Sequence, residues 1–472
     1  MDVEYWRGEL RRYGQEHLLR FWPELGDEAR RALLSDLEQI PFGQVAHLID
    51  SHVRRKPVFQ PPGSIEPASF YPARPDIDLV GRYADAIKRG ISLIRRNKVA
   101  ALTVAGGQGT RLGFEGPKGA FPISPVRNKP LFQLFAEFIR GARRRYGSQT
   151  RWYIMTSPAN DAQTKAFFRE HEFFGLPADD VVFFTQGQMP AFGPDGRILL
   201  DQKHRVALSP DGHGGTIRAL RRSSALKDMA DRGIEYISYF QVDNPLVRPL
   251  DPLFIGLHEL TGSELSSKTI PKADDLEPVG NFVVADGRLC VIEYSDLPES
   301  LARARNPDGS RRFDAGSIAI HILSRVFIER LTADPDRFAL PWHRAEKKVP
   351  WINEAGRRVV PDRPNAVKLE TFIFDAIPLA RNPLVLQTVR AEEFSPIKNA
   401  TGLDSPQTAR RDMVRRAAAW IESAGYSVPR RPDGEPDAVI EISPLLALDA
   451  EHLREVLLDG PRIRPGEQVY LE

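Results

Sequence analysis

Hydrophobic residues change their spacing along the chain, and each spacing predicts a different kind of element. Up to about residue 95, leucines and tryptophans recur every three or four positions among charged residues, as at Leu33, Leu34 and Leu37, which predicts amphipathic helices. The proline-rich stretch 57–75 interrupts this pattern, so we expect an extended segment that wraps a surface. A further helix is predicted over 83–96.

From residue 99 onward, short apolar runs rich in β-branched residues alternate with helical spacing. This alternation predicts an α/β fold with a mostly parallel sheet and helices on both of its faces. Ligands of such sheets bind at the carboxyl ends of the strands. Gly106-Gly107 and Asp243 both follow predicted strand ends, so we expect them to share a crevice. The predicted strands are 99–105, 152–156, 181–185 and 236–242, and the predicted helices are 131–146, 161–171 and 216–232.

After about residue 265 the pattern becomes that of antiparallel strands. Apolar runs at 282–285 and 289–294 flank Asp286-Gly287, which is a strong hairpin signal, and a second pair of runs flanks a turn at 354–357. From about residue 390 the chain has a loop, a helix at 408–424 and an irregular C-terminal stretch. The predicted organisation is an N-terminal helical region (1–95), a central α/β domain (96–389) and a small C-terminal lobe (390–472).

Composition narrows the classes of function. The chain has 65 Lys and Arg residues against 63 Asp and Glu, a net charge of +2, which argues against a general nucleic-acid binder. Its one cysteine, Cys290, rules out an intrachain disulfide and suits a reducing compartment. We find no apolar run near about 18 residues and no apolar core of a signal peptide at the N-terminus. We therefore expect a cytoplasmic protein without a membrane span.

The stretch V-A-A-L-T-V-A-G-G-Q-G-T-R-L-G-F-E-G-P-K-G, residues 99–119, joins a predicted strand to a glycine turn. Glycines let backbone N–H groups come close to an anion, because no Cβ stands in the way. Arg111 and Lys118 are two cations that could fold over the same anion. Strand, turn and cations together indicate a polyphosphate site, although a solvated turn is the plain alternative.

The two better-known glycine loops do not fit this stretch. A Walker A loop needs Ser or Thr after its lysine, but Gly119 follows Lys118. A dinucleotide fingerprint needs a third glycine where Leu112 stands, which also argues against a dinucleotide-dependent oxidoreductase.

Other segments offer single groups that suit a nucleotide and a sugar. Asp243 could hold Mg²⁺ beside a substrate phosphate, or could cap a turn. The second glycine loop, 209–215, permits close backbone approach, and its His213 is more often a structural residue than a base. Gln186 has donors and an acceptor that can read a base edge. Glu293 and Tyr294 suit sugar hydroxyls, and Lys368 and Lys398 are further cations, although each of these residues could equally lie on the surface.

Taken together, these segments resemble the eukaryotic-type UDP-sugar pyrophosphorylases, most closely the UDP-N-acetylglucosamine pyrophosphorylases. The matching segments occur in family order and cover roughly residues 95 to 410. They are L-T-V-A-G-G-Q-G-T-R-L-G with P-K-G, F-F-G-L, F-F-T-Q-G-Q-M-P, S-P-D-G-H-G-G, V-D-N, E-P-V-G, V-I-E-Y-S, F-D-A-G-S and E-E-F-S-P-I-K-N.

The resemblance implies a Rossmann-like nucleotidyltransferase fold, GT-A-like, with a mixed sheet flanked by helices. It also implies that UTP and a sugar 1-phosphate react with Mg²⁺ to give UDP-sugar and pyrophosphate, in a chemistry that needs mainly positioning and charge neutralisation. Carried over by position, the catalytic residues are Arg111, Lys118 and Lys398. The UTP-binding residues are Val104, Ala105, Gly106, Gly107, Gln186, Gly212, Asp243 and Lys368, with Asp243 also the metal ligand. The sugar-side residues are His213, Gly280, Glu293, Tyr294 and Ser317.

The departures from the family pattern concern the sugar. The family's second glycine loop usually reads D-G-N-G-G, whereas His213 stands at the asparagine position here, as in the UDP-glucose pyrophosphorylases. The usual F-N-A-G-N becomes F-D-A-G-S, with Asp314 and Ser317. N-acetylglucosamine 1-phosphate is the leading substrate, and glucose 1-phosphate and galactose 1-phosphate are the alternatives. A nucleotide-sugar-binding protein without catalysis is the alternative of another class, against which the retained cations and Asp243 argue.

Overall fold

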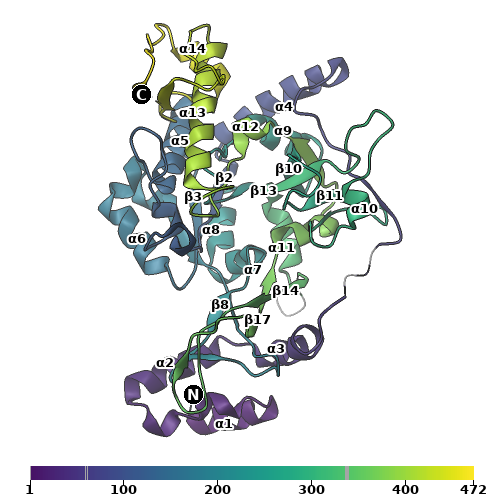
Figure 1. The fold of residues 1–472 in the computed structure, drawn as a ribbon, viewed down its shortest axis with the longest axis vertical. Coiled ribbons are helices and arrows are strands. Elements are labelled where there is room, and N and C mark those ends of the chain that lie inside the picture. The colour runs from purple at the N-terminus through teal and green to yellow at the C-terminus, as the bar shows by residue number, and fades with distance from the viewer. Residues whose placement is uncertain (1, 59, 61, 335–337, 339) are drawn as a thin grey trace. The chain divides into compact units, whose positions relative to one another are not determined.

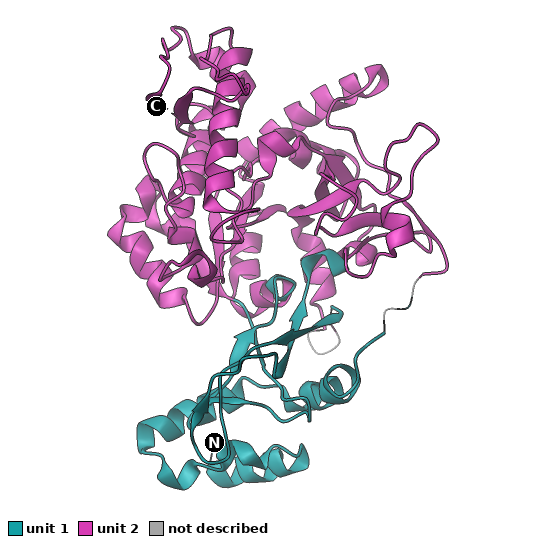
Figure 2. Ribbon diagram, viewed as in Figure 1, with its two compact units in different colours: residues 1–61, 186–216, 339–375 teal, residues 62–185, 217–338, 376–472 magenta. Residues whose placement is uncertain are grey.

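A computed structural model describes residues 2–58, 60, 62–334, 338 and 340–472 (Figure 1). Contacts between residues divide the chain into two compact units, coloured separately in Figure 2. Unit 1 comprises residues 1–61, 186–216 and 339–375, and unit 2 comprises residues 62–185, 217–338 and 376–472. The division into 1–95, 96–389 and 390–472 stays a prediction, because compact contacts do not define which regions fold alone.

Unit 2 is built around a mixed sheet, which has ten strands among the residues described. Four neighbouring strands run parallel in the order β9–β2–β3–β4, and they confirm the predicted α/β pattern. Each begins at the predicted residue, and the side chains of β2, β3 and β9 are mostly buried, whereas β4 is partly exposed. They are β2 (Val99–Val104), β3 (Trp152–Thr156), β4 (Val181–Thr185) and β9 (Tyr236–Gln241).

Antiparallel strands extend the sheet beyond β9, as the pattern after residue 265 predicts. The predicted hairpin is β11 with β12, and its turn residues Asp286 and Gly287 have φ values of 47° and 77°, which suits the tight turn of a two-residue hairpin. β10 pairs antiparallel with β13 and parallel with β18. The strands are β1 (Ile65–Pro67), β10 (Leu265–Pro271), β11 (Asn281–Ala285), β12 (Arg288–Ile292), β13 (Ala315–Ser324) and β18 (Leu384–Gln387).

Helices of unit 2 cover this sheet and share its core. The helix expected over 83–96 begins earlier, because the Asp76 side chain accepts a hydrogen bond from the Leu79 N–H and caps it. The core centres on aromatic side chains such as Phe132, Trp152 and Phe168, whose rings meet edge to face. The helices are α4 (Ile77–Arg95), α5 (Leu131–Tyr146), α6 (Asp161–Glu170), α9 (Pro252–Leu260), α10 (Glu299–Ala302) and α11 (Arg325–Leu331).

One predicted helix, 216–232, is wrong as a single element. The structure has α7 (Gly215–Arg222) and α8 (Ala225–Asp231) in its place. Ser224 between them has φ 64°, a left-handed conformation that a continuous helix cannot contain. The apolar spacing of the sequence continues across this break, so the pattern alone did not reveal it.

The C-terminal end, yellow in Figure 1, is more regular than expected. After α12 (Arg390–Glu393) and α13 (Pro406–Ser423), strands β19 (Ala438–Ile442) and β20 (Glu467–Leu471) pair in parallel, and α14 (Ala450–Val456) lies between them in the sequence. The expectation of an irregular stretch is therefore wrong. The lobe has its own core, which includes Ala418, Trp420 and Ile440. β20 was missed because it is short and none of its residues is fully buried.

Unit 1 combines the N-terminal helices with short two-stranded ribbons from later in the chain. Its core joins leucines such as Leu10, Leu33 and Leu37 to Phe192 and Leu369, so these helices pack on the ribbons. The helices are α1 (Val3–Arg12), α2 (Asp27–Glu38) and α3 (Phe42–Leu48). The ribbons pair β5 (Gln188–Pro190) with β8 (Leu208–Pro210), β6 (Leu200–Gln202) with β7 (Arg205–Val206), β14 (Trp342–Lys347) with β17 (Ala366–Thr371), and β15 (Trp351–Ile352) with β16 (Arg358–Val359). Within the described ranges of the whole chain, no helix has the length and apolar character needed to cross a bilayer.

Candidate active site

The first glycine turn follows β2 and is anchored by the neighbouring strand end. Ser157 Oγ donates to the Gly106 carbonyl oxygen at 2.8 Å. Asn160 Nδ2 donates to the carbonyl oxygens of Ala105 (2.9 Å) and Gly107 (3.2 Å). Ser157 and Asn160 are both buried, so they hold the turn in one conformation.

Gly107 is a glycine that the fold itself does not require. A Cβ added there would meet no heavy atom within 4 Å, and Gly107 is not among the glycines with positive φ. Within the part of the chain that the structure describes, the backbone N–H groups of Gly106 and Gly107 have no acceptor. A close-lying ligand is therefore a better reason for this glycine than the fold is, and the two N–H groups suit an anion.

Lys118 and Asp243 lie together at the carboxyl ends of two neighbouring parallel strands. Asp243 follows β9, whose last residue, Gln241, is the register partner of Val104 in β2. Lys118 begins the short helix η5 (Lys118–Ala120), and its Nζ lies 3.7 Å from Asp243 Oδ2. The structure thus brings the glycine loop and Asp243 together, as expected. Arg111, in η4 (Thr110–Leu112), has an exposed side chain.

A cavity of unit 2 gathers most of the predicted sugar-side residues beside Asp243. Its lining includes Asp243, Gly280, Glu293, Ser317 and Lys398. The Ser317 N–H donates to the Gly280 carbonyl oxygen at 2.8 Å, where β11 and β13 meet. The Glu293 carboxylate lies against the same glycine, since an added Cβ there would be 3.2 Å from Oε1. The cavity therefore offers a hydroxyl, a carboxylate and an amine to one ligand.

Two predicted residues relate to this cavity differently. Tyr294 is 52% exposed and does not belong to the lining, so the structure does not bring it together with Glu293 around the cavity. Lys398 Nζ lies 3.9 Å from Asp404 Oδ2. Burial raises the pKa of the Asp404 carboxyl, although the charge of Lys398 opposes the shift. The long, partly exposed contact leaves Lys398 able to contact a phosphate.

Gln186 and Gly212 form a second cluster, which belongs to unit 1. Gln186 is buried, and its Nε2 is 3.4 Å from the Gly212 carbonyl oxygen and 3.5 Å from Asp211 Oδ1. Gly212 has φ +86°, and a Cβ there would lie 2.3 Å from the Thr371 carbonyl oxygen. In contrast to Gly107, this glycine is required by the fold.

His213 is held by an aromatic cluster of unit 1. Its ring stacks on Phe372 with centroids 5.2 Å apart, and its Nδ1 accepts a hydrogen bond from the Ile373 N–H at 3.2 Å. Burial lowers the pKa of His213 to about 4, and the charge of His343 acts in the same direction. A neutral imidazole that accepts a backbone hydrogen bond fits a structural role. The other predicted sugar-side residues belong to unit 2.

Lys368 lies on β17, opposite Ala345 of β14. Burial lowers the pKa of Lys368, Glu370 opposes this shift, and the nearby charge of Lys347 adds to it. The side chain is a half-buried cation. A phosphate would relieve its unfavourable environment, because an anion favours the charged form.

Comparison with known proteins shows which family has this arrangement. The model of the family described as UTP–glucose-1-phosphate uridylyltransferase matches residues 79–424. The chain belongs to this family. The human UDP-N-acetylhexosamine pyrophosphorylase-like protein 1 is 40% identical over 487 residues, which cover 96% of this chain and 94% of the human one. The UDP-N-acetylglucosamine pyrophosphorylase of Saccharomyces cerevisiae is 34% identical, with 94% of each chain covered.

A solved structure agrees with this family assignment. The crystal structure of the uridine diphosphate N-acetylglucosamine pyrophosphorylase from Trypanosoma brucei, in complex with an inhibitor, superposes with a TM-score of 0.83 at 27% identity. It covers 100% of this chain and 98% of its own. The mixed sheet with flanking helices is thus the uridylyltransferase fold, as the resemblance implied.

The residues present fit a metal ion that the substrate helps to hold. Among the described residues, no group of three or more His, Cys, Asp or Glu side chains is arranged around one point. Asp243 is a single carboxylate, 15% exposed, which forms an ion pair with Lys118. Mg²⁺ is commonly bound through one or two carboxylates together with substrate phosphates and waters.

Several residues of the site were not identified from the sequence. Ser157 and Asn160 anchor the glycine turn, and their signal is the segment S-P-A-N directly after a predicted strand. Asn244 stands in the V-D-N motif without an assigned role, yet its Nδ2 donates to the Glu393 carbonyl oxygen at 2.6 Å. Strand-end amides of this kind are worth examining wherever an α/β sequence shows a glycine turn.

Proposed function

We propose that this protein is a UDP-sugar pyrophosphorylase, with N-acetylglucosamine 1-phosphate as its preferred sugar substrate. An oxygen of the sugar phosphate forms a bond to the α-phosphorus of UTP, and the bond from that phosphorus to the pyrophosphate oxygen breaks. The products are UDP-sugar and pyrophosphate. The observation that carries the proposal is the Lys118–Asp243 pair at adjacent strand ends, beside a cavity that also holds Lys398.

Each group has a place in this reaction that agrees with its chemistry. The N–H groups of Gly106 and Gly107 bind UTP phosphates, Arg111 contacts the β- and γ-phosphates, and Lys118 neutralises charge that develops on them. Lys398 orients the sugar phosphate toward the α-phosphorus. Val104 and Ala105 shape the UTP turn, Gln186 and Gly212 read the uracil, and Lys368 contacts UTP phosphate. These roles rest on the resemblance together with the geometry of each unit.

Asp243 is the residue that would hold Mg²⁺. When bound, the ion would neutralise charge on the phosphates during transfer. Its carboxylate is near enough to Lys118 for both to act on one phosphate chain. UTP and a sugar 1-phosphate are the partners in this proposal, with no nucleic acid and no membrane, and we place the reaction in the cytoplasm.

Two relatives support the acetylated sugar by name, while the loop residues keep a second candidate open. The Saccharomyces cerevisiae and Trypanosoma brucei proteins are both named for UDP-N-acetylglucosamine. Asp314, which replaces the family's asparagine, accepts from the Lys272 N–H at 3.0 Å and pairs with Arg311 at 3.3 Å. The Asp314 carboxylate is therefore bound to neighbouring protein groups. Ser317, Glu293 and Gly280 are the residues left to contact the sugar. Glucose 1-phosphate or galactose 1-phosphate is the second candidate, because a serine reaches less far than the usual asparagine.

Pyrophosphate release from UTP and Mg²⁺ tests the proposal, with the 1-phosphates of N-acetylglucosamine, N-acetylgalactosamine, glucose and galactose. Fastest release with N-acetylglucosamine 1-phosphate is the expected result. Fastest release with glucose or galactose 1-phosphate would keep the chemistry and replace the substrate. Binding of UTP without release from any of the four would favour a nucleotide-sugar-binding protein and contradict the proposal.

A further inference from the structure

Two segments of unit 2 carry Asp243 and Lys398, and their backbones are joined directly. We call residues 243–248 the Asp243 segment and residues 392–398 the Lys398 segment. The Ile397 N–H donates to the Asp243 carbonyl oxygen at 2.8 Å. Asn244 adds two bonds, from its Nδ2 to the Glu393 carbonyl oxygen (2.6 Å) and from the Ser395 N–H to its Oδ1 (3.1 Å). The position of Lys398 therefore depends on that of Asp243.

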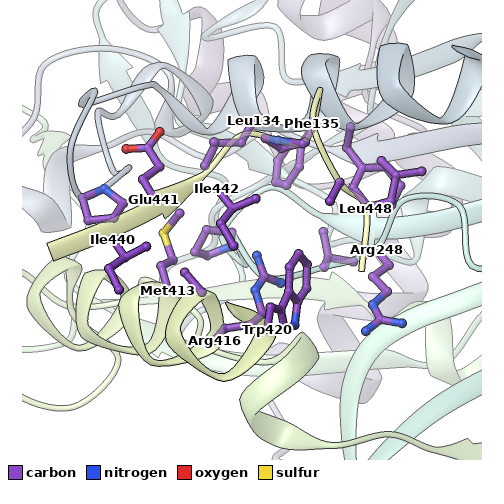
Figure 3. A pocket seen from close by; sticks show the side chains of 17 residues that line it. Leu134, Phe135, Arg248, Met413, Arg416, Trp420, Ile440, Glu441, Ile442 and Leu448 are labelled. Carbon is purple, nitrogen blue, oxygen red and sulfur yellow. The ribbon is translucent and has the colours of Figure 1, made fainter. Parts of the chain in front are cut away.

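One side chain of the C-terminal helix α13 bridges the same two segments. Arg416 Nη1 donates to the carbonyl oxygens of Leu246 and Glu392, at 2.9 Å in both cases. Leu246 belongs to the Asp243 segment, and Glu392 begins the Lys398 segment. Figure 3 shows Arg416 and Trp420 projecting from α13 into a cavity that Arg248 also lines. A single guanidinium thus fastens both segments to helix α13.

Charged neighbours hold this bridge in a fixed place. The Glu392 carboxylate accepts from Trp420 Nε1 at 2.9 Å and pairs with Arg248 at 3.1 Å. The next residue, Glu393, is buried and pairs with the buried Lys268. Arg416 also lies over the Trp420 ring, with its Cζ 5.1 Å from the centroid. Of these charged groups only Glu393 and Lys268 are buried, and Arg248 and Glu392 are 24% and 26% exposed. Displacing the buried pair would leave a charge without its partner, which favours one arrangement.

We infer that Arg416 is a positioning residue for the sugar-phosphate side of the site, and that helix α13 acts on catalysis through it. It touches neither Asp243 nor Lys398, but it sets the relative position of the two backbone segments that carry them. The inference rests on the proposed function for the chemistry, and on the hydrogen bonds alone for the positioning. Misplacement of reacting groups by about 1 Å lowers rates by about 10²-fold, which sets the scale of the expected effect.

The test compares Arg416→Met with a matched variant on the same helix. Arg410 also bonds two backbone carbonyls, those of Ile123 (3.2 Å) and Pro122 (2.9 Å), but these lie outside both segments. We expect Arg416→Met to lower kcat/KM for the sugar 1-phosphate by about 10- to 10²-fold. The dissociation constant of UTP alone should change by less than about threefold, because the Gly106–Gly107 turn is held by other residues. Arg410→Met should lower the melting temperature about as much as Arg416→Met does. It should not lower kcat/KM for the sugar 1-phosphate.

Two further measurements test whether Arg416 positions the two segments. They distinguish this role from a general loss of stability and do not depend on the proposed function. Hydrogen exchange of the Ser395 and Ile397 amides should be faster in Arg416→Met and unchanged in Arg410→Met. Arg416→Lys should lie between the wild type and Arg416→Met, because lysine keeps a charged donor but lacks the planar guanidinium that holds Nη1 between the two carbonyls.

Equal exchange and equal kinetics in the two methionine variants would overturn the inference. A wild-type protein without activity on any sugar 1-phosphate would contradict the proposed function. The exchange comparison would still support or overturn the positioning by Arg416 in that case.

Discussion

In the first glycine loop, a Cβ at Gly107 would meet nothing, and the charged Lys118 and Asp243 lie close by. In the second loop, a Cβ at Gly212 would collide with the Thr371 carbonyl, and the neighbouring His213 is held neutral. The first loop is therefore open, with charged side chains beside it, whereas the second is closed and holds the buried Asp211 next to the neutral His213. An open, charged loop suits phosphates, whereas a rigid loop with a buried Gln186 suits the flat, neutral base of a nucleotide.

The largest expected effect is that of Asp243→Asn. The amide keeps the size of the carboxylate but removes the charge that would hold a divalent ion, so turnover should fall by about 10³-fold or more. The measurement is pyrophosphate release as Mg²⁺ is varied. Asp161→Asn is the control, because Asp161 also follows a parallel strand but pairs with Lys165 and Thr156. Unchanged Mg²⁺ dependence in Asp243→Asn would show that this carboxylate only caps a turn.

Lys118→Met should have the next largest effect. Methionine keeps the apolar stem and removes the ammonium, so we expect turnover to fall by about 10²- to 10³-fold, as when one preorganised group facing developing charge is lost. Steady-state kinetics with UTP and the sugar 1-phosphate give kcat and KM separately. A near-normal kcat would contradict the role assigned to Lys118.

Alanine substitutions at Gly107 and Gly212 compare the two loops directly. Gly107→Ala should leave the free energy of unfolding within about 0.5 kcal/mol of wild type, yet weaken UTP binding by about tenfold or more, because the methyl group stands where the phosphates approach. Gly212→Ala should lower the free energy of unfolding by about 2 kcal/mol or more, because the added Cβ meets a backbone oxygen at positive φ. Denaturant unfolding and calorimetric titration of UTP give both quantities. Equal losses of stability in the two variants would remove the distinction between the loops.

The last expected effect is confined to acidic pH and is a change in the pH dependence of stability. The pKa of His213 is lowered from 6.5 to about 4, so the unfolded chain binds its proton more readily than the folded one. This contribution is fully present above about pH 6.5 and is lost as the pH falls toward about 4, at roughly 1.4 kcal/mol per pH unit. His213→Asn should therefore flatten the fall of the unfolding free energy across this range. An unchanged slope would show that His213 does not titrate as its surroundings indicate.

The sequence predicted the parts of this protein that depend on local pattern. Buried parallel strands, the Asp286-Gly287 hairpin and the proximity of Asp243 to the glycine loop all follow from short-range signals and from the rule that parallel strands end at one edge. The break at Ser224 and strand β20 did not, because a left-handed serine and a short, partly exposed strand leave little trace in apolar spacing.

The spacing of apolar residues along the chain did not predict the long-range contacts. Arg416 reaches the Leu246 carbonyl across 170 positions, and nothing in either segment signals the partner. The N-terminal helices likewise give no indication that they pack on ribbons formed by residues 186–216 and 339–375. The roles of individual site residues stay predictions until variants are measured.

The most direct test follows the oxygen atoms of the reaction. The sugar 1-phosphate is labelled with ¹⁸O in its non-bridging phosphate oxygens and incubated with UTP, Mg²⁺ and the protein. The masses of UDP-sugar and pyrophosphate are then measured by mass spectrometry. Attack of the sugar phosphate on the α-phosphorus predicts that all of the label enters the UDP-sugar and none enters pyrophosphate. Label in pyrophosphate, or no UDP-sugar at all, would contradict uridylyl transfer by this protein.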